Sequence, residues 1–164
     1  MSERKITVTS IAQGAIIAAL YVVLCIVFQP ISFGAVQFRI AEALTILPLF
    51  TPAAVPGLFI GCLLGNLLTG AIIWDVIFGS IATLIGAIFG YMLRSNRWLV
   101  PFPAVLANTV IVPFILKYGY GDPTPMPLMF LYLFIGEILG CYILGEILAY
   151  ILMPYRKVIF REKA

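Results

Sequence analysis

Residues 33–50, FGAVQFRIAEALTILPLF, are apolar enough to lie in a membrane, yet they carry Arg39 and Glu42 only three positions apart. A charged side chain at membrane depth costs roughly 2.5–3.5 kcal/mol on insertion scales, and such residues usually mark a functional site. The stretch therefore predicts both a chain that crosses a membrane and a polar site held within it.

The composition of the whole chain agrees with a membrane protein. Its 164 residues are 63% hydrophobic and 10% charged, with a mean hydropathy of +1.12. A soluble globular domain has about 25% charged residues, so this chain has too few polar groups to cover a soluble surface. Because a helical span takes about 20 residues, about six spans use nearly the whole length. We predict an all-α integral membrane protein, a six-transmembrane-helix bundle that forms a single domain over residues 1–164.

The apolar segments are expected to be helices, because barrel strands would alternate polar and apolar residues and these segments do not. They are residues 8–28, 36–50, 54–69, 74–93, 98–117 and 126–153. An even number of spans puts both termini on one side, and most lysines and arginines fall on that side. Since cytoplasmic loops carry the excess of positive charge, both termini are predicted to be cytoplasmic. The basic C-terminal tail is expected to contact anionic membrane lipid.

This topology brings polar residues from different segments to similar depths. The outer ends of the second, third and fourth segments meet near the outer surface. Glu137 lies about eleven residues into the sixth segment, about 17 Å at 1.5 Å per residue, and so beneath them. We predict a pocket that opens to the outside and binds a small molecule. Its predicted substrate-binding residues are Gln37, Arg39, Glu42, Asn66, Trp74, Asp75, Asn108, Tyr132 and Glu137.

Several of these residues have structural alternatives. Arg39 and Glu42, three residues apart, can neutralise each other on one helix face. Asp75 stands where an N-cap residue of the fourth helix would stand. The aromatic residues either stack on a flat ligand or belong to the interfacial belt. Glu146, nine residues beyond Glu137, faces the opposite side of its helix and is interpreted as an inner-edge or subunit-contact residue.

The charges of the predicted pocket indicate what it binds. One arginine stands against Glu42, Asp75 and Glu137, which leaves a net charge of about −2 if all three ionise. Such a site suits a cation, or a ring that presents paired N–H donors to a carboxylate, because carboxylates accept two donors side by side.

A different pattern on the first segment suggests a partner. Ala15 and Ala19 are four residues apart, and small residues at this spacing let another helix come close. They serve either packing within the bundle or docking of another membrane subunit.

The chain lacks the motifs of most enzymes. It has no histidine, its three cysteines stand singly in apolar runs, and we expect no metal and no cofactor. The phosphate loop GxxxxGK[ST] and the nucleophile motif GxSxG are both absent, so the chain is not expected to be an enzyme or to hydrolyse ATP itself. No nucleic-acid partner is expected.

Three stretches resemble the QueT family, the substrate-binding S components of energy-coupling factor transporters for queuosine precursors. They are FGAVQFRIAEALTILPLF, GLFIGCLLGNLL and IIWDVIFGSIATLIGAIFGYML, and QFRIAEAL is the most specific part. The Ala15/Ala19 pair looks like the AxxxA docking motif of S components. The resemblance implies a multi-pass protein of the bacterial plasma membrane. Its implied partners are an energy-coupling transmembrane subunit and two ABC ATPases. The resemblance also implies a mechanism in which the loaded subunit topples in the membrane and releases substrate inward.

The substrates implied by this resemblance are 7-deazaguanines such as preQ1, preQ0 or queuine. From topology we expect Glu137 or Glu42 on the ring donors, Asp75 on an amine, and Arg39 and Gln37 on the carbonyl, with Trp74 or Tyr132 stacking on the ring. Alternatives are an S component for another vitamin-like heterocycle, a membrane enzyme or lipid-handling protein, and a stand-alone proton-coupled carrier that uses Glu137 and Glu146.

Overall fold

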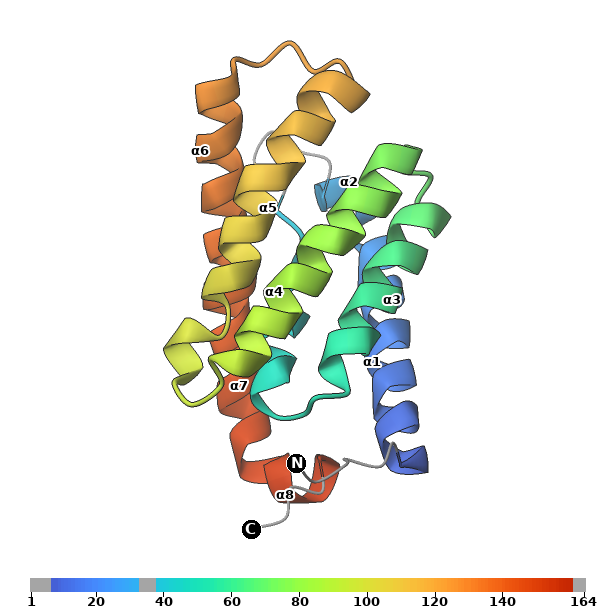
Figure 1. The fold of residues 1–164 in the computed structure, drawn as a ribbon, viewed down its shortest axis with the longest axis vertical. Helices are drawn as coiled ribbons and strands as arrows, with labels where there is room; N and C mark the ends of the chain where they lie inside the picture. The colour runs from blue at the N-terminus through green and yellow to red at the C-terminus, as the bar shows by residue number, and fades with distance from the viewer. Residues whose placement is uncertain (1–6, 33–37, 161–164) are drawn as a thin grey trace.

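The computed structural model describes residues 7–32 and 38–160, and within these ranges every regular element is a helix (Figure 1). The predicted all-α bundle of six apolar segments is therefore confirmed. The elements are α1 (Val8–Val27), α2 (Gln29–Ser32), η1 (Ile40–Leu49), α3 (Ala54–Leu68), η2 (Asp75–Gly79), α4 (Ser80–Met92), η3 (Arg97–Leu99), α5 (Phe102–Phe114), η4 (Ile115–Gly119), α6 (Met126–Glu137), η5 (Ile138–Leu144), α7 (Gly145–Leu152), η6 (Met153–Tyr155) and α8 (Arg156–Ile159).

Successive segments run up and down the bundle. η2 continues into α4, α5 into η4, and α6 through η5 into α7, so each of these sets forms one long helix. Among the described residues, four helices are long and apolar enough to cross a membrane: Val8–Val27, Asp75–Met92, Arg97–Gly119 and Met126–Ile159. α3 and η1 are shorter.

The second segment is the most unusual element. η1 is a 3₁₀ helix of 10 residues, although 3₁₀ helices rarely run beyond 3–4 residues. At about 2.0 Å per residue it is about 20 Å long, shorter than the roughly 30 Å hydrocarbon core of a bilayer. It contacts α1, α3, α4, η5 and α7, and every residue from 41 to 48 is buried. An element that is covered by neighbours on every side lies in the interior, so its two polar residues, Glu42 and Thr45, are buried together with its apolar ones.

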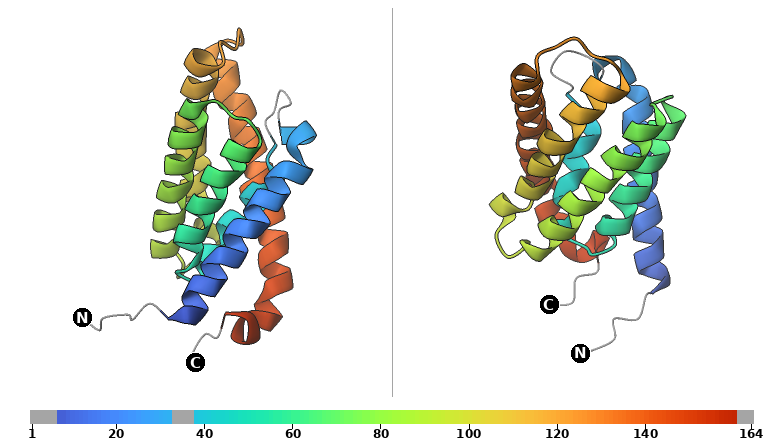
Figure 2. Two further views of the ribbon diagram at one scale, coloured as in Figure 1. Left: turned by 90° about the vertical axis from the view of Figure 1, so that its right-hand side faces the viewer. Right: turned by 45° about the horizontal axis from the view of Figure 1, so that its top comes forward.

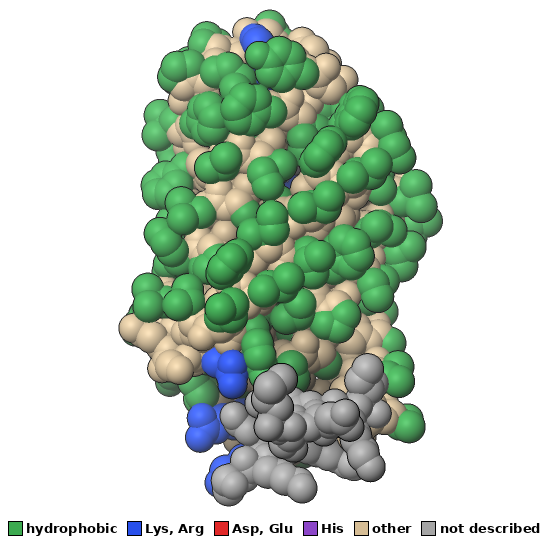
Figure 3. Space-filling view, in the orientation of Figure 1, with side chains coloured by type: hydrophobic (Ala, Val, Ile, Leu, Met, Phe, Trp, Pro, Cys, Tyr) green, Lys and Arg blue, Asp and Glu red, His purple; other side chains and the backbone are tan. Residues whose placement is uncertain are grey.

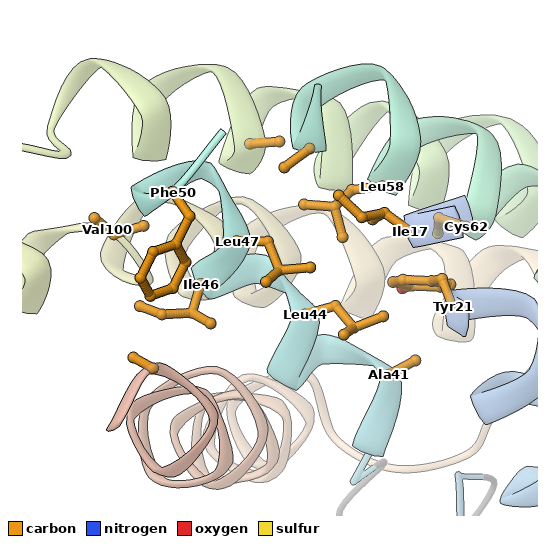
Figure 4. Close-up of a cluster of buried hydrophobic side chains, with 13 residues drawn as sticks. Ile17, Tyr21, Ala41, Leu44, Ile46, Leu47, Phe50, Leu58, Cys62 and Val100 are labelled. Atoms are coloured by element: carbon orange, nitrogen blue, oxygen red, sulfur yellow. The ribbon is translucent and has the colours of Figure 1, made fainter. Parts of the chain in front are cut away.

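The side chains of η1 form the middle of the hydrophobic core. Leu44, Ile46 and Leu47 all belong to this core (Figure 4). Leu44 and Leu47 point toward the side of η1 on which Leu58 and Tyr21 lie. Because η1 passes through the centre, any polar residue on it is buried as well. This position is what puts Glu42 in the interior.

α1 and α3 pack closely along glycines. A Cβ atom at Gly61 would lie 2.7 Å from the Cβ atom of Tyr21, and one at Gly57 would lie 2.8 Å from the carbonyl oxygen of Gly14. Only residues without a side chain allow the two backbones to come this close. Ala15 and Ala19 are exposed on another face of α1. Packing within the bundle is therefore the wrong interpretation of that pair.

The two ends of the bundle differ in charge. The beginning of α1 and the whole of α8 lie at the same, lower end (Figures 1 and 2), where Gln13 Nε2 donates to the carbonyl of Ile159 at 3.2 Å. On the face shown in Figure 3, hydrophobic side chains cover the middle of the molecule, and most of the visible Lys and Arg side chains lie near the lower end. This arrangement agrees with the predicted placement of both termini on one side.

Candidate functional site

Arg39 joins three segments in the upper half of the bundle. Its Nη2 donates to Asn66 Oδ1 at 3.3 Å and lies 3.7 Å from Asp75 Oδ2. Asn66 in turn donates from Nδ2 to the backbone carbonyl of Asp75 at 3.2 Å. We call Arg39, Asn66 and Asp75 the arginine cluster. The predicted convergence of these three residues is seen in the structure, and Arg39 pairs with Asp75 rather than with Glu42.

The backbone at Arg39 explains this choice of partner. Arg39 is the N-cap of η1, with φ −100° and ψ 110°. This conformation is extended, so its side chain does not follow the helical spacing that would set it above Glu42. An ion pair between Arg39 and Glu42 would require helical backbone at both residues, and Arg39 is extended.

Asp75 begins the π-helical turn η2 and is buried. Its side chain is not an N-cap, because η2 has Trp74 at its N-cap position and no side-chain capping hydrogen bond. Asp75 Oδ2 instead accepts from the Tyr120 hydroxyl at 3.2 Å. Burial raises the pKa of Tyr120, which keeps this hydroxyl a neutral donor. Asp75 Oδ1 accepts no hydrogen bond from any described residue. Single π turns in α-helices are frequent at functional sites.

Glu42 and Glu137 form a second polar group deeper in the bundle, which we call the carboxyl pair. The side chains come from η1 and from the end of α6, and the two residues are 1% and 4% exposed. Tyr21 donates to Glu42 Oε1 at 2.6 Å, and Cys141 donates to Glu137 Oε2 at 3.2 Å. One carboxylate oxygen of each acid and Cys141 Sγ lie within 4.8 Å of one another.

The carboxyl pair lacks a counter-charge. Within the described residues neither acid forms an ion pair with a lysine or arginine, and Glu42 Oε2 is buried without a hydrogen bond of good geometry. The buried amide of Asn108, from α5, is a common neighbour of both carboxyl groups. Two buried carboxylates this close repel each other, so the pair requires a proton or a cation.

The three ligand atoms fit an ammonium group better than a structural metal ion. Glu42 and Glu137 offer oxygen, and Cys141 offers sulfur. Structural zinc takes four ligands, usually nitrogen or sulfur, and calcium takes six to eight oxygens. Three mixed ligands meet neither requirement, whereas an ammonium group needs only acceptors around it.

Trp74 lies outside both groups. It is 55% exposed and stacks on Phe78, with ring centroids 5.9 Å apart. Both rings border an apolar cavity of about 520 Å³ between the start of η2 and the helix formed by α5 and η4. The other residues that line this cavity are Val110, Ile111, Phe114, Ile115, Tyr118 and Gly119.

The remaining predicted residues are less informative. Tyr132 is half-buried on α6, at the edge of its buried face. Gln37 lies outside the described residues. Within the arginine cluster and within the carboxyl pair, the side chains lie against one another. A ligand that binds to either group must therefore replace some of these contacts.

Sequence reasoning missed the residues that hold the acids in place. The sequence does not single out Tyr21 and Cys141, which stand in apolar runs, or Tyr120. The signal for Tyr21 was present, because it is the only side chain with a hydroxyl group between residues 11 and 31. A buried tyrosine hydroxyl usually finds a hydrogen-bond partner.

Glu146 is far from both groups. Its Oε2 lies 3.0 Å from Arg97 Nη2, in the loop between α4 and α5 at the lower end. Its predicted location at the inner edge agrees with this contact.

Comparisons with known proteins agree with the resemblance seen in the sequence. The model of the family described as QueT transporter matches residues 11–154. A curated relative, the queuosine precursor transporter QueT of Lactococcus lactis subsp. cremoris (strain MG1363), is 35% identical over 92 residues. That alignment covers 55% of this chain and 54% of the relative, so it spans about half of each protein. No solved structure matches the chain.

Proposed function

Since this chain belongs to the QueT transporter family, we propose that it captures a queuosine precursor from outside the cell. The substrate class is 7-deazaguanines such as preQ1, preQ0 or queuine. The relative named as a queuosine precursor transporter supports this class of substrate. The binding residues proposed are those of the arginine cluster and the carboxyl pair.

The observation that carries the proposal is the unpaired oxygen of Asp75 beside Arg39. A guanine-like edge offers a carbonyl oxygen next to N–H donors. We assign these donors to Asp75, whose buried Oδ1 accepts no hydrogen bond from a described residue, and we assign the carbonyl to the Arg39 guanidinium, which lies 3.7 Å from Oδ2. Donor and acceptor therefore stand side by side, as the ring edge requires.

The contacts that a ligand must replace are weak ones. Charge-assisted hydrogen bonds are typically about 2.7–2.9 Å long. Arg39 lies 3.7 Å from Asp75 and 3.3 Å from Asn66, both longer than this range. Exchanging these contacts for shorter ones to a ligand favours binding.

The chain acts in this proposal as the S component of an energy-coupling factor importer in the bacterial plasma membrane. Ala15 and Ala19 are exposed on α1, away from the glycine seam with α3, and so are available to a second membrane subunit. ATP hydrolysis belongs to two ABC ATPases attached to that subunit. The positive-inside rule assigns the basic lower end to the cytoplasm, and the arginine cluster then faces the outer leaflet.

Two measurements test the proposal. Purified protein should bind radiolabelled preQ1 or preQ0 and should not bind guanosine. Cells should take up the label only when the coupling subunit and ATPases are expressed. Uptake that continues without them and stops when the proton gradient is dissipated would support a proton-coupled carrier instead. A lack of binding by folded protein would refute the substrate assignment.

A further inference from the structure

The charges of the interior are divided between two groups. Arg39 lies beside Asp75 and Asn66, so the arginine cluster contains its own counter-charge. The carboxyl pair, Glu42 and Glu137, holds two acids and no base. This division could not be read from the net charge of about −2, which treats all three acids alike.

The neighbours of the carboxyl pair are nearly all neutral. Tyr21 faces it from α1 and Asn108 from α5, while Cys141 belongs to η5. Cys62, from α3, lies near Glu42. Arg39 is the one positive neighbour among the described residues, and its closest contacts are to the other group. No described group neutralises the pair directly.

The spacing of the pair suits one ammonium group. The N–H bonds of an ammonium group are at the tetrahedral angle, so two carboxylate oxygens that each accept from one nitrogen at 2.7–2.9 Å lie about 4.4–4.7 Å apart. The nearest oxygens of Glu42 and Glu137 lie within 4.8 Å, and Glu42 Oε2 is buried and unbonded. One cationic nitrogen between the two acids would satisfy that oxygen and neutralise their charge.

The two groups are adjacent along η1. Glu42 is one 3₁₀ turn below Arg39, about 6 Å at 2.0 Å per residue. In a 7-deazaguanine the substituent on C7 projects beside the ring carbonyl. A ring whose carbonyl is held by Arg39 can therefore extend that substituent toward the carboxyl pair.

On these grounds we propose that Glu42 and Glu137 are the binding site of a protonated amine, so the protein selects precursors with an aminomethyl cation over those with an uncharged substituent. This inference rests on the proposed function. In the empty protein the pair holds one shared proton, and the incoming ammonium group displaces it. The exchange balances: one cation enters, one proton leaves to solvent, and no covalent bond to the ligand changes.

The roles expected from topology are thereby exchanged. Asp75, which was expected to hold the amine, takes the ring donors together with Arg39. Glu42 and Glu137, which were expected on the ring donors, take the amine. The reason is that Asp75 already has a positive partner at 3.7 Å, whereas the carboxyl pair has none.

The test compares preQ1, which carries an aminomethyl cation, with preQ0, which carries a neutral nitrile at the same position. Purified protein should bind preQ1 at least about tenfold more tightly, the effect expected from hydrogen bonds to charged groups. Calorimetry in buffers of different ionisation enthalpy should detect release of about one proton with preQ1 and none with preQ0.

Variants separate this inference from the proposed function. Glu42→Gln and Glu137→Gln should weaken the binding of preQ1 by a factor at least about tenfold larger than they weaken the binding of preQ0. Glu146→Gln, at the far end of the bundle, should leave the affinity for both ligands unchanged. Equal affinity of the wild-type protein for both ligands, or no proton release, would overturn the amine site and leave the proposed function standing. Binding of neither ligand would overturn both. The ligand comparison uses the wild-type protein, so it does not depend on whether a variant folds.

Discussion

The Tyr21 hydroxyl donates a 2.6 Å hydrogen bond to Glu42 Oε1, and the two residues are 0% and 1% exposed. This bond links α1 to η1 at the centre of the bundle. A buried acceptor that loses its donor destabilises a protein by about 1–3 kcal/mol.

Tyr21→Phe is therefore expected to lower the stability of the protein by about 1–3 kcal/mol, because Glu42 loses its donor while remaining buried. Thermal unfolding in detergent measures the change. Tyr150→Phe is the matched control, since Tyr150 is 76% exposed. Equal unfolding temperatures for the two variants would show that the hydrogen bond contributes nothing.

The glycine seam makes a second prediction. Gly61→Val should destabilise the packing of α1 on α3 by about 1–3 kcal/mol, the usual effect of overpacking. The added Cβ would lie 2.7 Å from the Cβ of Tyr21 and 3.1 Å from the backbone of Ala18, and neither can move far. Ala15→Val, on the exposed face of α1, adds the same kind of bulk outside the seam and should unfold like the wild type.

Asp75 carries the proposed recognition of the ring. Asp75→Asn removes the charge that faces Arg39. It should weaken the binding of both preQ1 and preQ0 by at least about tenfold, since hydrogen bonds to charged groups are worth roughly 1.5–3 kcal/mol. Equilibrium binding with both ligands measures this. A loss confined to preQ1 would move the amine to Asp75 and contradict the assignment made here.

Trp74 should matter little for binding. Its ring lines the apolar cavity and stacks on Phe78. Trp74→Ala is expected to change the affinity for preQ0 by less than about threefold, or roughly 0.7 kcal/mol. Loss of about tenfold or more would instead support the stacking role expected from the sequence.

The docking proposal can be tested without changing the site. Ala15→Leu together with Ala19→Leu should abolish co-purification with the coupling subunit, because bulky side chains prevent close approach of a second helix. The affinity for preQ1 should stay as in the wild type. Val110→Leu, on the exposed side of α5, adds bulk elsewhere and should co-purify normally. Unchanged assembly of the double variant would exclude this surface as the docking face.

Much of the site was accessible from the sequence because charged residues in an apolar chain are few. Arg39, Glu42, Asp75 and Glu137 were selected for that reason, and the structure brings them into two neighbouring groups. Tyr21 and Cys141 were harder to find. Both residue types are common in apolar helices, and only a neighbour from another helix shows what they bond to.

The sequence by itself determined the membrane class, the six apolar segments and the shared side of the termini, because hydropathy and the distribution of positive charge are properties of local segments. Only the tertiary structure decided that Arg39 pairs with Asp75 and that Glu42 meets Glu137. Those pairings depend on the extended backbone at Arg39 and on the rotation of a central 3₁₀ helix against its neighbours. Neither follows from spacing along the chain, because contacts between helices are fixed by packing.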